Sequence, residues 1–201
     1  MNKVFEIKYF IFEDDKEDFS IMSLEEFERE FTNIYGMFTV IFDGNKFISY
    51  LDEENECPLE ARRVFSELIN AYFDGLIYIV SHLEEYSFFY LKYIENSTTW
   101  LKFSVKETEI LVSEIEINWN QEMNNGLKNI VTTHSELFNT PIQETWGDVR
   151  LKKEIFKAEV TDKLFSFISE IKSTNQNILK SKIFSEQIRY LYNSGLDIIS
   201  N

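Results

Sequence analysis

The sequence predicts an α+β fold: a mainly antiparallel sheet, with a central meander, packed against several helices. Three consecutive segments are typical of strands, namely 87–95, 99–105 and 109–119. The first is a nearly continuous apolar run, and the other two alternate apolar with polar residues, as a strand with one buried face does. The connections between them are short and polar, so neighbouring strands are expected to pair antiparallel.

Length and composition favour one domain over residues 1–201, with residues 121–201 forming a more helical C-terminal half. Of the 201 residues, 44% are hydrophobic and 16% aromatic, which supplies enough apolar surface to build a core. The chain has only 2 Pro and 6 Gly, so its composition argues against a flexible linker between independent domains.

The N-terminal region is predicted to contain a strand and a helix separated by a loop. Apolar and charged residues alternate over 4–12, which predicts the strand. The acidic run at 14–18 is expected to be a loop that continues to Ser23. Ser23 and Glu26 form a capping box, in which each side chain can bond the other residue's backbone N–H, so a helix should begin there. Gly36 is expected to end this helix.

A hairpin and a longer helix are predicted next. Segments 37–42 and 46–51 are rich in strand-forming residues and flank an Asp-Gly-Asn turn at 43–45, which indicates the hairpin. A second acidic loop follows at 52–56. A proline at the first position of a helix loses no hydrogen bond, so a helix is predicted from residue 58 to residue 73.

The remaining segments are less regular outside the meander. Residues 76–80 are apolar on every side, so their spacing is compatible with a helical turn or a short strand. A weakly helical segment is expected over 120–139 and an extended one over 144–156. Apolar spacing predicts two further helices, at 161–172 and from 183 to about 195.

Charge is distributed unevenly along the chain. Thirty-five acids and 20 bases give a net charge of −15; residues 1–60 contribute −11, residues 61–120 contribute −4, and residues 121–201 are neutral. An acidic surface repels nucleic acid and anionic lipid, and it attracts a basic protein. The sequence therefore predicts a basic protein partner, no nucleic-acid binding and no membrane binding, while the oligomeric state stays open.

The compartment is expected to be the cytoplasm. No apolar run approaches the ~20 residues of a membrane span, and the first residues contain no apolar export signal. The single cysteine, Cys57, cannot form an internal disulfide and fits a reducing compartment.

The sequence contains no recognisable catalytic, metal or cofactor motif. The two histidines, His82 and His134, do not occur at metal-ligand spacing, and one cysteine cannot build a thiolate site. Glycine-rich phosphate-binding loops and the nucleophile elbow are also missing, and neither acidic run matches a calcium-binding loop. We therefore expect no catalytic residue, no metal and no cofactor.

The acidic residues of the first 60 positions are the candidate partner-binding site. Their carboxylates would imitate phosphates and speed the encounter with a basic protein, while a few aromatic residues would supply affinity. The residues expected to contact the partner are Asp14, Asp15, Glu17, Asp18, Asp52, Glu53, Glu54 and Glu56.

In size, acidity and absence of catalytic motifs, the whole chain resembles the immunity proteins that bacteria make beside polymorphic or contact-dependent toxins. The resemblance rests on this general character, so it assigns no role to any single residue. It implies a small cytoplasmic α+β inhibitor without enzymatic activity, which covers the active face of a basic toxin such as a nuclease.

Two other functions are compatible with the sequence. One is a small enzyme or ligand-binding domain with a pocket between sheet and helices, where His82 or His134 would lie beside a carboxylate. The other is a structural or oligomeric module, which would expose a sizeable apolar patch.

Overall fold

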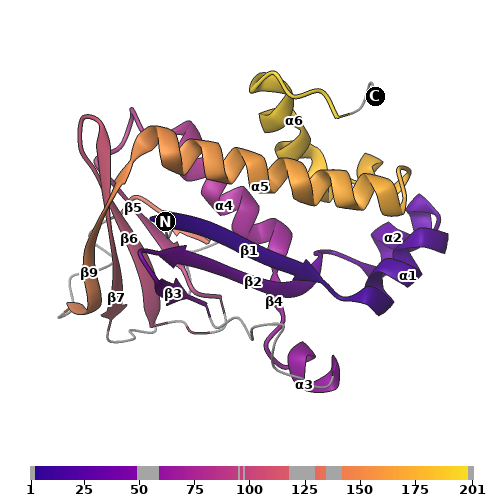
Figure 1. Cartoon of the computed structure of the whole chain (residues 1–201). Helices are drawn as coiled ribbons and strands as arrows, with labels where there is room; N and C mark the ends of the chain where they lie inside the picture. The colour runs from indigo at the N-terminus through magenta and orange to yellow at the C-terminus, as the bar shows by residue number, and fades with distance from the viewer. Residues whose placement is uncertain are drawn as a thin grey trace.

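A computed structural model describes residues 3–48, 59–94, 96, 98–117, 130–134 and 142–198. These residues form an α+β fold with two antiparallel sheets, and long helices cover the core between them (Figure 1). The predicted fold class and its antiparallel meander are confirmed. Within the described segments, no helix combines the length and the hydrophobicity that crossing a membrane requires.

The first sheet has the described strand order β1-β2-β3, with β4 also paired to β2. These strands are β1 (Phe5–Ile11), β2 (Tyr35–Phe42), β3 (Asn45–Phe47) and β4 (Glu67–Leu68). The predicted first strand and the predicted hairpin are confirmed, although the second hairpin strand, predicted over 46–51, ends at Phe47, and residues 49–51 lie outside the described residues. The hairpin turn places residues 43 and 44 at φ values of 48° and 85°, the left-handed region that the Asp-Gly sequence tolerates.

The second sheet contains the meander and has the described order β8-β5-β6-β7-β9. Its strands are β5 (Phe88–Lys92), β6 (Thr99–Val105), β7 (Glu109–Ile117), β8 (Val131–Thr132) and β9 (Ile142–Lys152). The predicted weak helix over 120–139 lies mostly outside the described residues. Its described part contains β8, so the helical prediction is wrong there: pairing with β5 determines the conformation.

Two helices, α4 (Ile69–Ser81) and α5 (Lys153–Thr174), pack against the sheets, and a third, α6 (Ser185–Asn193), packs against these two helices. Two single turns, η3 (Ile178–Lys180) and η4 (Lys182–Phe184), connect α5 to α6. Residues 76–80 belong to α4, so the helical alternative was correct. Of the predicted helix from residue 183 to about 195, residues 183 and 184 lie in η4 and 185–193 form α6.

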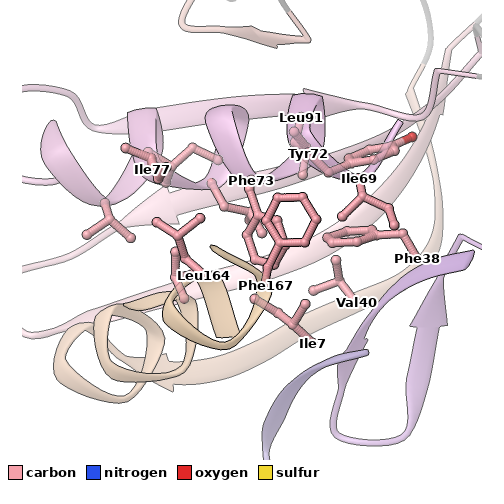
Figure 2. Packing of buried hydrophobic residues seen from close by; sticks show 14 of the residues in the cluster. Ile7, Phe38, Val40, Ile69, Tyr72, Phe73, Ile77, Leu91, Leu164 and Phe167 are labelled. Carbon is pink, nitrogen blue, oxygen red and sulfur yellow. The ribbon is translucent and has the colours of Figure 1, made fainter. Parts of the chain in front are cut away.

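The core between α4, α5 and the first sheet contains packed aromatic rings together with aliphatic side chains. Figure 2 shows Phe73 of α4 against Phe167 of α5, with ring centroids 5.2 Å apart. Tyr72 stacks on Phe38 of β2 at 5.0 Å. The same buried cluster continues into the second sheet, where Phe103 lies 6.1 Å from Phe42. Burial of this apolar surface is the main force that holds sheets and helices together.

One long helix over residues 58–73 was predicted, and this prediction is wrong. Helix α3 (Leu59–Arg63) ends early, and Glu67 and Leu68 pair as β4 with the start of β2 before α4 begins. The Ile69 N–H continues this contact by donating to the Ile34 carbonyl at 2.9 Å. Tertiary strand pairing therefore interrupts a segment whose apolar spacing alone indicates one helix.

The predicted extended segment 144–156 is confirmed as far as Lys152 and is wrong beyond it. Strand β9 ends at Lys152, and α5 begins at Lys153, well before the predicted helix start at 161. Phe156 is fully buried in the first turn of α5, 5.1 Å from Phe5 and 5.6 Å from Phe103. Because this anchor is set by residues far away in the sequence, the local pattern does not reveal it.

A polar contact fixes α6 to α4. The fully buried Gln187 donates from Nε2 to the Asn70 carbonyl at 3.1 Å and to Asp74 Oδ1 at 3.0 Å. Desolvation by burial raises the pKa of Asp74 to about 6, although the Gln187 hydrogen bond acts in the opposite direction. The charged form of Asp74 is therefore costly in the folded protein.

Replacing this carboxylate tests that cost. Because the folded pKa of Asp74 exceeds its ordinary value of 3.8, the native state keeps a proton that the unfolded chain loses between about pH 4 and pH 6. Stability contributed by this group falls as the pH rises through that window. Asp74→Asn should therefore increase the free energy of unfolding by about 1–2 kcal/mol at pH 7 and by little at pH 4.

Urea unfolding over this pH range measures the difference. Asp162→Asn, which removes an exposed carboxylate from α5, is the control. A gain for Asp74→Asn that does not change with pH would contradict the assignment.

Candidate functional site

The most strongly charged part of the described structure is a pair of short helices, α1 (Glu13–Ile21) and α2 (Leu24–Glu30). Residues 13–30, which we call the acidic hairpin, contain nine Asp and Glu and only two bases, for a net charge of −7. Figure 1 shows this hairpin at one end of the molecule, beside the C-terminal end of α5. The net charge of −7 on the acidic hairpin is nearly half of the chain's net charge of −15.

Helix α1 corrects the prediction of an acidic loop at 14–18. Its first turn contains Glu13, Asp14 and Asp15, where negative charge is favoured by the helix dipole. Its only buried side chain is Phe19, so the helix lacks the repeating apolar stripe from which helices are recognised in a sequence.

Helix α2 begins at the predicted capping box. Ser23 Oγ accepts from the Glu26 N–H at 3.2 Å, and the Ser23 N–H donates to Glu26 Oε2 at 2.9 Å. The Ser23 hydroxyl also donates to Glu26 Oε2 at 2.8 Å, and the two hydrogen bonds that this carboxylate accepts from the Ser23 backbone and side chain lower the pKa of Glu26. The helix ends at Glu30, earlier than the predicted stop at Gly36, because the chain turns to an extended conformation at Phe31 before entering β2.

Aromatic packing fastens the acidic hairpin to the body of the protein. Phe19 of α1 lies 5.5 Å from Phe27 of α2 and 4.9 Å from Phe31. Phe27 in turn stacks on Phe184, 6.1 Å away, at the entrance to α6. Phe19, Phe27 and Phe184 are fully or almost fully buried, so the two helices share a continuous apolar base.

Hydrogen bonds and ion pairs fix the same hairpin from the side of α5. Asn175 Nδ2 donates to the carbonyls of Phe19 and Met22, at 2.8 and 2.9 Å. Lys16 Nζ lies 2.7 Å from a Glu13 oxygen and 3.3 Å from a Glu170 oxygen. The carboxylates are thus presented on a backbone whose position is already determined.

Asp14 and Asp15 bind an arginine of the chain itself. Arg63 Nη2 lies 2.6 Å from Asp14 Oδ2 and 2.8 Å from Asp15 Oδ1, and Nη1 lies 3.4 Å from Asp15 Oδ2. The guanidinium also covers the ring of Phe12, 4.8 Å from its centroid. The Arg63 hydrogen bond is the largest influence on Asp14 and lowers the pKa of its carboxyl.

The other two predicted residues of this region, Glu17 and Asp18, are exposed on α1. Together with Glu25 and Glu28 of α2, they form no ion pair with any described residue. Glu25 and Glu28 were not among the predicted site residues, because the sequence pattern places them in a helix and does not show which side of it faces solvent. The available signal was their place next to the apolar positions of that helix: Glu25 follows Leu24, and Glu28 follows Phe27.

The second half of the predicted site cannot be compared with the structure. Asp52, Glu53, Glu54 and Glu56 lie outside the described residues, as does Cys57. The structure therefore brings Asp14, Asp15, Glu17 and Asp18 together on one helix and adds Glu25 and Glu28 from the next.

An exposed apolar residue lies within this charged surface. Ile21 ends α1 and is 83% exposed, although its neighbours Phe19 and Phe27 are buried. An exposed aliphatic side chain at the end of an acidic helix resembles the organisation of protein interfaces, in which apolar anchors are bordered by polar groups.

The two histidines of the alternative enzymatic site follow different elements of the structure. His82 stacks on Tyr78, with ring centroids 4.3 Å apart, and its Nδ1 donates to the Tyr78 carbonyl at 2.8 Å. His134 is exposed after β8. In the part of the chain that the structure describes, no three His, Cys, Asp or Glu side chains are grouped so that they could hold a metal ion.

Comparison of the chain with protein-family models, with curated proteins and with solved structures gives no match. The geometry and charge of the acidic hairpin are therefore the features from which a function can be inferred.

The Arg63 contact can be tested by titration. Arg63→Gln should raise the pKa of Asp14 towards its ordinary value of 3.8, because the dominant hydrogen bond to the carboxylate is lost. Arg62→Gln removes the same charge from the same helix and should change this pKa less. Side-chain carboxyl shifts followed by NMR over pH 2–6 give both values. Equal pKa values for Asp14 in the two variants would contradict the contact.

Proposed function

We propose that this chain is a non-enzymatic binding protein that neutralises a basic protein partner through its acidic hairpin. The observation that supports the proposal is the net charge of −7 in residues 13–30, presented on two anchored helices. The partner class is a toxin domain, such as a nuclease, whose phosphate-binding face is basic. The proposal includes the cytoplasmic location and the inhibitory role that a resemblance to immunity proteins implies.

Unpaired carboxylates would act mainly on the rate of association. Glu17, Asp18, Glu25 and Glu28 are exposed, so their field extends into solvent and attracts a cationic surface over about one Debye length. Exposed charges add little to the final affinity, because their attraction is screened and their side chains must be ordered.

Affinity would come from apolar contact at the centre of the surface. Ile21 is the described side chain best placed for it, since it is 83% exposed between the two acidic helices. Because the hairpin is already fastened by Asn175 and the buried phenylalanines, little conformational entropy remains to be lost on binding.

A charge-reversal variant tests the proposal. The partner is first isolated from the native host by capture on the wild-type protein at low salt, and its binding kinetics are then measured. Changing Glu17, Asp18, Glu25 and Glu28 to Lys should lower the association rate by about tenfold or more at low salt and weaken its salt dependence. Ile21→Ser should instead raise the dissociation rate and leave the association rate nearly unchanged.

The matched control reverses four exposed carboxylates elsewhere, namely Glu85, Glu107, Glu116 and Asp162. This control changes the net charge by the same amount but leaves the acidic hairpin intact. If both variants associate with the partner equally fast, the hairpin is not the contact surface and the proposal fails.

A further inference from the structure

Arg63 makes a contact that has the form of an intermolecular recognition site. Its guanidinium donates hydrogen bonds to both oxygens of Asp15 and to one oxygen of Asp14, and it covers the face of the Phe12 ring. Planar guanidinium groups bind carboxylate oxygens in a fork and lie well on aromatic rings, whereas an ammonium group cannot match this geometry. The three residues therefore form a receptor for arginine that is occupied within the chain.

The occupying segment is weakly attached. None of the α3 side chains that the structure describes is buried, and the two residues that follow, Val64 and Phe65, are 78% and 46% exposed. Figure 1 shows α3 apart from the helices that cover the core. Besides the Arg63 contact, Arg62 lies over the Phe10 ring at 5.7 Å.

The contact is partly open to solvent. The side chains of Arg63 and Asp14 are 37% and 46% exposed, so water and competing cations reach this pair, whereas the Asp15 side chain is 13% exposed and Phe12 is buried. The exposed pair with Asp14 contributes little to stability, so a competing guanidinium meets the contact first at Asp14.

We propose that Arg63 is an internal ligand that occupies, and thereby guards, the site at which an arginine of the basic partner binds Asp14, Asp15 and Phe12. This inference rests on the function proposed above. The partner binds when the guanidinium of its own arginine replaces that of Arg63 between the Asp14 and Asp15 carboxylates. A lysine-rich surface lacks the fork and competes poorly, so the contact discriminates against polycations that carry only charge.

The test measures binding of two probes, octa-arginine and octa-lysine peptides, by calorimetry at low salt. Arg63→Gln should bind octa-arginine more tightly than Arg62→Gln does, by up to about fivefold. The two variants should bind octa-lysine with more similar affinities. Arg62→Gln is the matched control, because it removes the same charge from the adjacent position of α3.

A second pair of variants shows whether the gain comes from this site. When Asp14→Asn and Asp15→Asn are added to each arginine variant, the two variants should bind octa-arginine with equal affinity. Equal binding of octa-arginine by Arg63→Gln and Arg62→Gln would overturn the guarding role while leaving the acidic hairpin as a binding surface. Absence of binding by every variant, wild type included, would overturn both proposals.

Discussion

Mutual repulsion among nine carboxylates is the constraint that shapes the N-terminal part of this protein. Residues 13–30 place these groups on two short helices that would not be stable in isolation. Their conformation depends on the buried phenylalanines beneath them and on the Asn175 hydrogen bonds. The core formed by α4, α5 and the sheets thus does more than fold the chain: it holds a charge distribution that the hairpin could not hold alone.

The anchoring divides the carboxylates of the hairpin into two groups. Asp14, Asp15 and Glu13 form ion pairs with bases of the chain, which relieves part of the repulsion. Glu17 and Asp18 form no ion pair with a described base, and they are the groups that a cationic partner would meet first. An acidic surface with some carboxylates paired inside the chain can be stable in the free protein, and its unpaired carboxylates can still bind a cationic partner. The proposed exchange at Arg63 would connect these two properties.

Local patterns in the sequence identified those elements that local chemistry determines. The capping box at Ser23 and the Asp-Gly turn at 43–45 were predicted correctly, because each needs only neighbouring residues. Strand β4 and the early start of α5 were not, since they depend on pairing with β2 and on burial of Phe156 against distant rings. The same limit applies to the site: the acidity of residues 14–18 was evident, but their helical conformation and the Arg63 contact arise from tertiary structure.

The claim that the body of the protein holds the acidic hairpin in place is tested most directly by amide hydrogen exchange at low ionic strength, where repulsion is strongest. The account predicts that hydrogen-bonded amides of α1 and α2, such as that of Phe27, are protected nearly as strongly as those of β1 and α5. Rapid exchange throughout α1 and α2, while β1 and α5 remain protected, would show that the hairpin is not held in advance and would contradict the account.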